Sequence, residues 1–178
     1  MKLHLGCGKR FIKGFVHIDI LDYPHIDHIS SIDNLSFIVD NSVDLIYNCH
    51  VLEHFKINEV ARVVKEWNRV LKPNGLLRSS VPDFKRICKV YTNTENLDLV
   101  KGPVFGRQDY LYNIHYNIFD KKSLTTLFEE NNFYNVREYD WRETEHAEVD
   151  DYSQAYIPHM DKENGTLISL NLECNKKN

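Results

Sequence analysis

Residues 2–8 read Lys-Leu-His-Leu-Gly-Cys-Gly, an alternating apolar run followed directly by a glycine turn. The alternation predicts a β-strand over Lys2 to Leu5, and a second strand is predicted over Phe15 to Ile20 with Asp19 near its end. The two glycines let a ligand approach the backbone, because neither carries a Cβ. A carboxylate at the end of the second strand can accept hydrogen bonds from both ribose hydroxyls. This layout predicts a nucleoside-binding site, although such turns are also common without a ligand.

Length and charge limit the classes of protein to consider. The chain has 178 residues, which is enough for one domain, and a formal net charge of −4, which disfavours a protein that grips nucleic acid. No apolar run approaches the roughly 20 residues of a membrane-spanning helix, and no signal peptide is expected. The widely spaced cysteines Cys7, Cys49, Cys88 and Cys174 are interpreted as reduced thiols of a cytoplasmic protein.

Strands and helices alternate in the first half of the chain. A strand is predicted over residues 43–47, a helix with one apolar stripe within 52–71, and a buried strand over 76–81. This order favours a mostly parallel sheet with right-handed crossovers.

Only residues 9–14 connect the first glycine turn to the second strand, whereas a parallel crossover normally needs about a dozen residues. The first crossover helix is therefore expected to be shortened or missing. Part of one sheet face would then be uncovered, and Phe11, Ile12 and Phe15 become candidates for an exposed apolar patch and a homodimer interface.

Two stretches in the second half of the chain are predicted to lie outside the core. Residues 83–119 are rich in tyrosine, and residues 142–164 are acidic and are predicted to form a solvated loop. We expect both excursions to lie on the substrate side. The remaining predicted elements are a helix over 121–131 with Asp120 as its N-cap and strands over 136–141 and 166–174.

Several ordered motifs together resemble a known family. They are Leu-His-Leu-Gly-Cys-Gly at 3–8, Asp19, Asp-Asn-Ser-Val-Asp-Leu-Ile-Tyr at 40–47, His-Val-Leu-Glu-His at 50–54, and residues 66–82. The pattern resembles the Rossmann-like (class I) S-adenosylmethionine-dependent methyltransferases, and most closely the small type-11 methyltransferase-like group. The resemblance implies an α/β fold with a seven-stranded sheet of order 3-2-1-4-5-7-6, in which strand 7 is antiparallel, and one domain over residues 1–178.

The resemblance also implies a cofactor, S-adenosyl-L-methionine, and residues that contact it. The turn of Gly6, Cys7 and Gly8 is expected beneath the methionine part, and Asp19 at the ribose. Ile20 is expected to pack on the adenine.

Two further contacts are expected from the same resemblance. The family often has an acid near position 31 for the adenine amino group, but this chain has Ser31 there, followed by Ile32, with Asp33 as an alternative. Asn48 and His50, at the end of the fourth strand, are expected near the sulfonium.

Methyl transfer from a sulfonium needs mainly alignment of the acceptor, and a base matters when the acceptor is a hydroxyl. His115 is the first candidate base and His50 the second, although His115 could equally be a structural histidine of a tyrosine-rich loop. Asp83 is a candidate substrate contact or a turn residue. The resemblance and the tyrosines favour a small polar acceptor, such as a sugar or a surface glycan, and O-methylation.

Two alternatives stay open. One is a non-catalytic partner subunit that binds S-adenosylmethionine or nothing, suggested by the short first crossover and by Ser31. The other is a zinc hydrolase, because His50-Val51-Leu52-Glu53-His54 matches H-x-x-E-H. The run follows a strand directly, so His50 is expected to precede the helix and lose the required geometry. We expect no metal ligand among the site residues.

Overall fold

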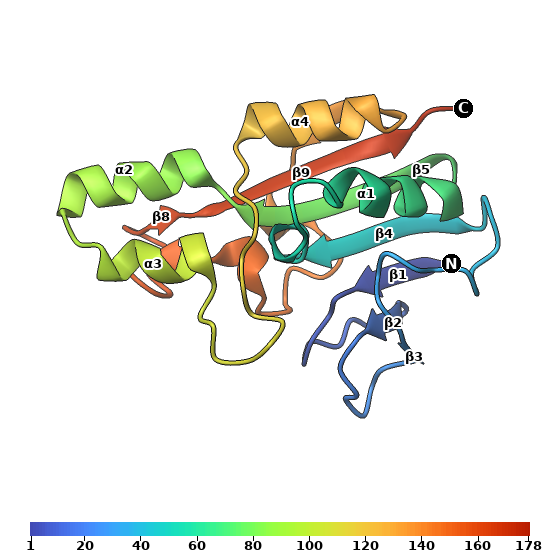
Figure 1. Cartoon of the computed structure of the whole chain (residues 1–178), viewed down its shortest axis with the longest axis horizontal. Coiled ribbons are helices and arrows are strands. Elements are labelled where there is room, and N and C mark those ends of the chain that lie inside the picture. The colour runs from blue at the N-terminus through green and yellow to red at the C-terminus, as the bar shows by residue number, and fades with distance from the viewer.

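The computed structural model describes residues 1–178 and is built on one seven-stranded sheet with the order β3-β2-β1-β4-β5-β9-β6 (Figure 1). Its strands are β1 (Lys2–Leu5), β2 (Val16–Asp19), β3 (His28–Ile29), β4 (Val43–Cys49), β5 (Leu71–Pro82), β6 (Phe133–Glu138) and β9 (Ser169–Lys176). The first five strands pair in parallel, and β9 is antiparallel to both β5 and β6. The predicted fold class, strand order and antiparallel last strand are confirmed.

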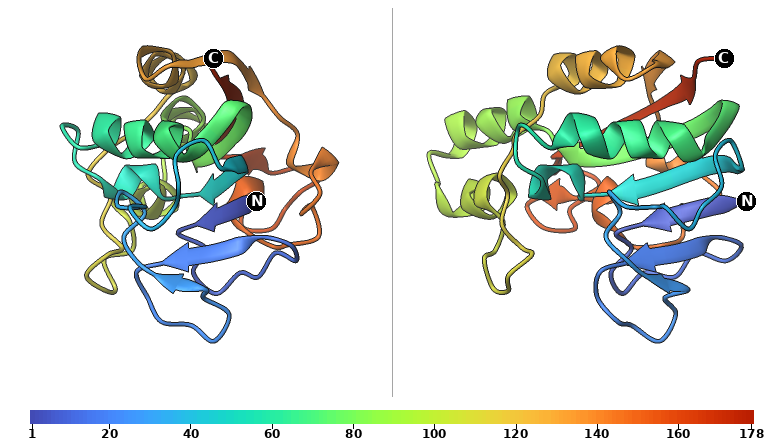
Figure 2. Two further views of the ribbon diagram at one scale, coloured as in Figure 1. Left: turned by 90° about the vertical axis from the view of Figure 1, so that its right-hand side faces the viewer. Right: turned by 45° about the vertical axis from the view of Figure 1, so that its right-hand side comes forward.

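Two helices cover one face of the sheet. Helix α1 (Val60–Val70) follows β4, and its stripe of Val63, Val64 and Trp67 is fully buried in the main core. Helix α4 (Lys121–Glu130) lies on the same face (Figure 2) and begins at Asp120, which accepts a hydrogen bond from the Ser123 N–H, as predicted for an N-cap. Spacings of three and four residues between apolar side chains explain both burial patterns.

The opposite face carries no crossover helix between β1 and β2, as predicted. It is covered instead by the segment 139–157, which contains the short turns η2 (Trp141–Glu143) and η3 (Tyr152–Gln154) (Figure 2). Beneath it, Ile12 and Phe15 pack with Leu45 and Tyr47 in a second apolar cluster. The expected exposed patch is therefore wrong for Ile12 and Phe15, and only Phe11 is exposed. Because Ile12 and Phe15 are covered, the exposed apolar patch that suggested a homodimer interface does not form.

The prediction that residues 142–164 form a solvated loop is wrong in part, because most side chains of the segment are exposed or partly buried but several are buried against the sheet. His146, Asp151, Ser153 and Gln154 are buried, and the Tyr47 hydroxyl donates a hydrogen bond of 2.5 Å to Asp151 Oδ2. Asp151 serves as an anchor, because a buried carboxylate with hydrogen-bond donors can hold a loop against a sheet. The acidic composition alone did not reveal this role.

Residues 83–119 form a separate lobe beyond β5. It contains α2 (Phe84–Thr94) and α3 (Asp98–Phe105), which pack around Ile87, Val90, Val100 and Ile168. The small hairpin of β7 (Tyr156–Ile157) and β8 (Thr166–Leu167) joins this lobe to the acidic segment. Asp83 is the N-cap of α2, where it accepts from the N–H groups of Lys85 and Arg86. None of the helices is long and apolar enough to cross a membrane.

Some predicted boundaries moved by several residues. Strand β5 begins at Leu71, directly after α1, and includes the Pro-Asn-Gly turn at 73–75 through an irregular register with β4. Strand β6 begins at Phe133, three positions before the predicted 136, because Phe133 is fully buried and pairs with Lys176.

Candidate functional site at the carboxyl ends of β1, β2 and β4

The glycine turn after β1 adopts backbone conformations that would be strained for residues other than glycine. Gly6 has φ +62° and Gly8 has φ +54°, in the left-handed region that favours glycine. A Cβ on Gly6 would lie 2.7 Å from Val51 Cγ2, whereas one on Gly8 would meet nothing within 4 Å. The turn therefore packs closely against the segment after β4 on one side, and Gly8 is open on the other.

Asp19 fixes this turn from the end of β2. Its Oδ2 accepts from the Gly8 N–H at 2.8 Å and its Oδ1 accepts from the Leu21 N–H at 2.8 Å. The side chain is only 6% exposed. A carboxylate has about four lone-pair sites, so each oxygen retains acceptor capacity. The carboxylate is thus held in one orientation at the strand end and can still accept from a ligand.

The residues expected around the adenine lie in different environments. Ile20 is exposed, whereas Ile32 is buried in the main core and its carbonyl accepts from Trp67 Nε1 at 2.9 Å. Ser31 hydrogen-bonds to Asp33, and Asp33 pairs with Arg62 at 2.6 Å. Asp33 is thus already neutralised by a protein cation.

Asn48 lies fully buried near the end of β4. Ser79 Oγ donates to its Oδ1 at 2.7 Å, but its Nδ2 has no hydrogen-bond partner. An unsatisfied buried amide is costly. This Nδ2 is the unpaired donor at the end of β4.

His50 follows β4 in a left-handed conformation with φ +53°. Its Nε2 lies 2.9 Å from Ser169 Oγ, and that hydroxyl donates to the Tyr152 carbonyl. The hydroxyl therefore accepts from an Nε2–H, which leaves the lone pair on Nδ1. This Nδ1 lies 3.5 Å from Glu53 Oε1.

The segment of the H-x-x-E-H run is not an α-helix. Only η1 (Leu52–His54), a single 3₁₀ turn, follows His50. The expected loss of the helical geometry that a zinc peptidase of this type needs is confirmed.

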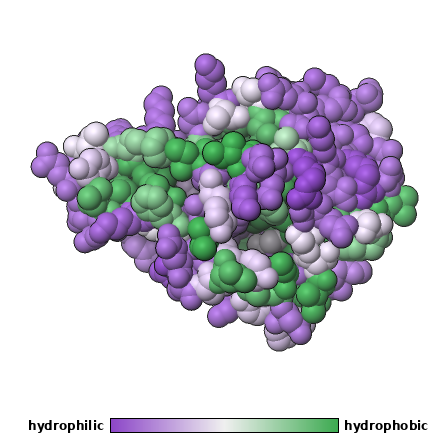
Figure 3. Space-filling view, in the orientation of Figure 1, coloured by the Kyte–Doolittle hydropathy of each residue, from purple (hydrophilic) through white to green (hydrophobic).

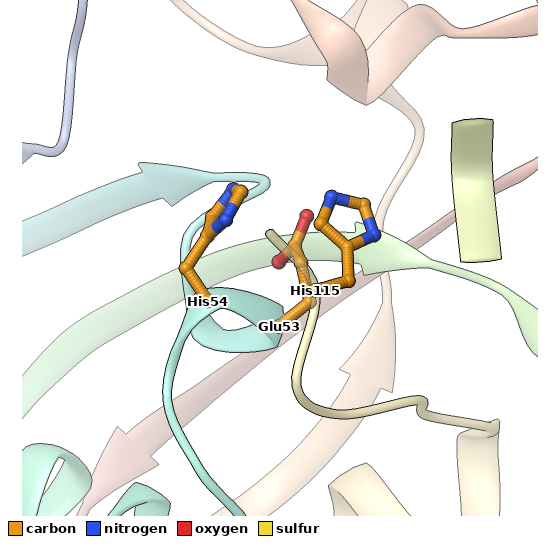
Figure 4. Close-up of side chains that lie close together, drawn as sticks. All are labelled: Glu53, His54 and His115. Carbon is orange, nitrogen blue, oxygen red and sulfur yellow. The ribbon is translucent and has the colours of Figure 1, made fainter. Parts of the chain in front are cut away.

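Three side chains meet beside His50, and sequence analysis did not bring them together (Figure 4). Glu53, His54 and His115 each place one potential ligand atom within 4.8 Å of the others. His54 Nδ1 lies 3.0 Å from the Ile114 carbonyl, and His115 Nδ1 lies 3.0 Å from the Pro103 carbonyl. Because carbonyls only accept, each Nδ1 donates, and the free lone pair of each neutral ring is on Nε2.

Burial sets the protonation of this cluster. Glu53 is 1% exposed with neither carboxylate oxygen hydrogen-bonded, and burial raises its pKa to about 8. Burial, with a smaller contribution from His54, lowers the pKa of His115 to about 4. Burial likewise lowers the pKa values of His50 and His54. At neutral pH the three imidazoles are therefore neutral.

The backbone of residues 114–117 holds His115 in place. The Glu53 carbonyl accepts from the N–H groups of Tyr116 and Asn117 at 2.8 and 3.2 Å. The space-filling view shows a hollow near the middle of this side of the molecule (Figure 3). Residues that lie between Gly6 and His115 in the sequence thus gather at the strand ends, where ligands of open α/β sheets bind.

The strand order and the antiparallel last strand are those of the Rossmann-like methyltransferase fold. The predicted resemblance to the type-11 group is confirmed, because residues 18–78 match the model of a family described as a methyltransferase domain. The match and the fold together support S-adenosylmethionine as the cofactor.

Solved structures share this fold. An S-adenosylmethionine-dependent methyltransferase from Archaeoglobus fulgidus has a TM-score of 0.60 and 12% identity, over 98% of this chain and 85% of the other. One from Methanosarcina mazei has a TM-score of 0.58 and 19% identity, over 99% and 92%.

A third similar structure contains ligands. It is the 1,6-didemethyltoxoflavin-N1-methyltransferase of Burkholderia thailandensis with its acceptor and S-adenosylhomocysteine, at a TM-score of 0.56 and 11% identity, over 99% of this chain and 71% of the other. No curated protein sequence matches the chain significantly.

Proposed function

We propose that this protein transfers the methyl group of S-adenosylmethionine to a small polar acceptor, and that the acceptor atom is a hydroxyl oxygen of a sugar or a similar compound. The observation that carries the proposal is the Asp19 carboxylate, fixed by the Gly8 N–H at 2.8 Å where β1 and β2 end. That position suits a ribose diol, and the glycine turn beside it suits the methionine part.

The sulfonium is proposed to lie at the end of β4. The unpaired Nδ2 of Asn48 and the ring of His50 are the polar groups there. A sulfonium is a good leaving group, so the protein contributes chiefly by aligning the acceptor with the methyl group. Neutral side chains that donate and accept hydrogen bonds suit this task.

The acceptor is proposed to enter beside the loop 106–118. Tyr110, Tyr112 and Tyr116 are exposed there. Partial burial, followed by Tyr23 and Asp19, raises the pKa of Tyr110, which supports a position of this ring close to the proposed ribose site. Rings with hydroxyl groups suit a sugar, since they offer an apolar face and a hydrogen-bonding tip.

His115 was the first candidate base. Its Nε2 is unprotonated at neutral pH and can accept a proton, but a pKa of about 4 makes it a weak base. The proposed reaction therefore depends on alignment more than on proton removal by His115.

The test is an acceptor screen in which release of S-adenosylhomocysteine from S-adenosylmethionine is measured with sugars and small alcohols. We expect release that depends on at least one acceptor and an equal amount of methylated product. Tight binding of S-adenosylmethionine with no release across the panel would contradict catalysis and favour the partner-subunit alternative.

A further inference from the structure

The buried carboxylate of Glu53 is the most unusual feature outside the proposed cofactor contacts. Both of its oxygens are buried and neither has a hydrogen-bond partner. An unpaired carboxylate in such a place is strongly unfavourable, and proteins normally pair it, protonate it or use it to bind a metal. No lysine or arginine pairs with it, and His50, whose Nδ1 lies 3.5 Å from Oε1, is its one charged-type neighbour within 4 Å.

The histidines around Glu53 present lone pairs rather than donors. Their N–H groups are committed elsewhere: His54 and His115 donate Nδ1–H to backbone carbonyls, and His50 donates Nε2–H to Ser169. A backbone carbonyl behind the ring is the usual arrangement of a metal-ligating histidine, because it fixes the tautomer and the ring orientation.

His50 lies close to Glu53 without satisfying it. Nδ1 of His50 and Oε1 of Glu53 lie 3.5 Å apart, and neither oxygen of Glu53 has a hydrogen-bond partner. A hydrogen bond between such groups is about 3 Å long or shorter. The carboxyl group of Glu53 is therefore left without a partner among the side chains around it.

We propose that Glu53, His54 and His115 bind one divalent first-row transition metal ion, with His50 as a close neighbour. The three ligand atoms lie within 4.8 Å of one another. Atoms bound to one tetrahedral zinc ion are about 3.3 Å apart, so small side-chain rotations complete the site. His54 and His115 are only partly buried, which leaves room for these rotations.

The ligand types select the class of ion. Two imidazoles and one carboxylate suit Zn²⁺, Fe²⁺ or Mn²⁺, whereas Mg²⁺ and Ca²⁺ prefer oxygen ligands alone. Three protein ligands leave an open coordination position. If the proposed function holds, an acceptor hydroxyl would bind there, and His115 would then be a ligand rather than a base.

The test uses the full-length protein, stripped of metal with a chelator and without S-adenosylmethionine, so that its result is independent of the methyltransferase proposal. Titration with Zn²⁺ is expected to give one site with micromolar or tighter affinity, and Mg²⁺ to give none. Glu53→Gln and His115→Gln are each expected to weaken Zn²⁺ binding by about 100-fold or more, since even outer-shell changes cost 10- to 100-fold. His159→Gln, at an exposed histidine, is the matched control and is expected to bind like the wild type.

Two measurements distinguish metal binding at this site from metal binding elsewhere and from misfolding of a variant. Co²⁺ is expected to give a visible spectrum without a thiolate charge-transfer band, which excludes binding through Cys7 and its neighbour His25. Zn²⁺ is expected to raise the midpoint of thermal unfolding of the wild type but not of Glu53→Gln, which is isosteric and should fold. Absence of Zn²⁺ binding, or equal binding by Glu53→Gln and His115→Gln, would overturn the proposal.

Discussion

Asp19 Oδ2 accepts a hydrogen bond of 2.8 Å from the backbone N–H of Gly8. This single bond joins the turn after β1 to the end of β2, and it orients the carboxylate at the place where a ribose is expected. The geometry of the turn and the position of the acid therefore depend on each other, and changes in either should affect both stability and cofactor binding.

Gly6→Ala is expected to destabilise the protein by about 2–4 kcal/mol. The new Cβ would lie 2.7 Å from Val51 Cγ2, and the residue would keep a positive φ, so overpacking and backbone strain add. Chemical denaturation measures the loss. Gly8→Ala is the matched control, because it has the same type of φ but no contact within 4 Å, and it should cost only about 1 kcal/mol.

A double-mutant cycle tests the steric part directly. Gly6→Ala combined with Val51→Ala should lose less stability than the sum of the single variants, by about 1 kcal/mol or more. Strict additivity would show that Val51 does not crowd the turn.

Tyr47→Phe is expected to lower the free energy of unfolding by about 1–3 kcal/mol. The change removes the hydroxyl that donates to Asp151 Oδ2 at 2.5 Å and leaves a buried carboxylate oxygen without this donor. Tyr134→Phe is the control, since its hydroxyl bonds to Asn74 at an exposed edge, and it should cost about 0.5 kcal/mol or less. Equal losses for the two variants would contradict the anchoring role of Asp151.

Stability is expected to fall as the pH is lowered from about 6.5 to 4. Burial lowers the pKa of His146 to about 4, and neither ring nitrogen has a hydrogen-bond partner. The unfolded chain takes up this proton near pH 6.5 and the folded chain does not, so the free energy of unfolding decreases across this range by about 2–3 kcal/mol. Urea denaturation at a series of pH values measures the slope.

The variant His146→Phe isolates this contribution. It should show a smaller decrease between pH 6.5 and 4. The remaining slope comes from the other histidines whose pKa values burial lowers, and Glu53, whose pKa burial raises, opposes it; these histidines are His4, His17, His50, His54 and His115. His159→Gln, at an exposed position, should keep the wild-type slope. An unchanged slope in His146→Phe would show that this ring is not the buried base responsible.

The individual strands were predictable because glycine turns, alternating apolar runs and one amphipathic stripe are local features, whereas the strand order was implied by the resemblance to a known family. The cover of the second sheet face was not predictable. Residues 9–14 were correctly predicted to be too short for a helix, yet the chain that replaces the helix comes from 139–157. Its acidic composition predicted exposure to solvent. Asp151 is instead buried and accepts a hydrogen bond from Tyr47, which lies 104 positions away in the sequence.

The cofactor side of the site could be proposed from sequence, since each residue follows a strand end. The cluster around Glu53 could not. His115 belongs to a loop beyond two helices. Hydrogen bonds from residues 116 and 117 to the Glu53 carbonyl, and from His54 to the Ile114 carbonyl, bring it to His54. The H-x-x-E-H run contains two members of the cluster, Glu53 and His54, which lie in a 3₁₀ turn after β4 rather than in an α-helix.

The most direct test of the central claim is calorimetric titration of the protein with S-adenosylhomocysteine, comparing the wild type with Asp19→Asn and with Asp22→Asn, an exposed acid three positions later. Charge-assisted hydrogen bonds to the ribose are worth about 1.5–3 kcal/mol, so Asp19→Asn should bind about 10- to 100-fold more weakly while Asp22→Asn binds like the wild type. Equal affinity of all three proteins, or no binding by the wild type, would contradict the proposed cofactor site.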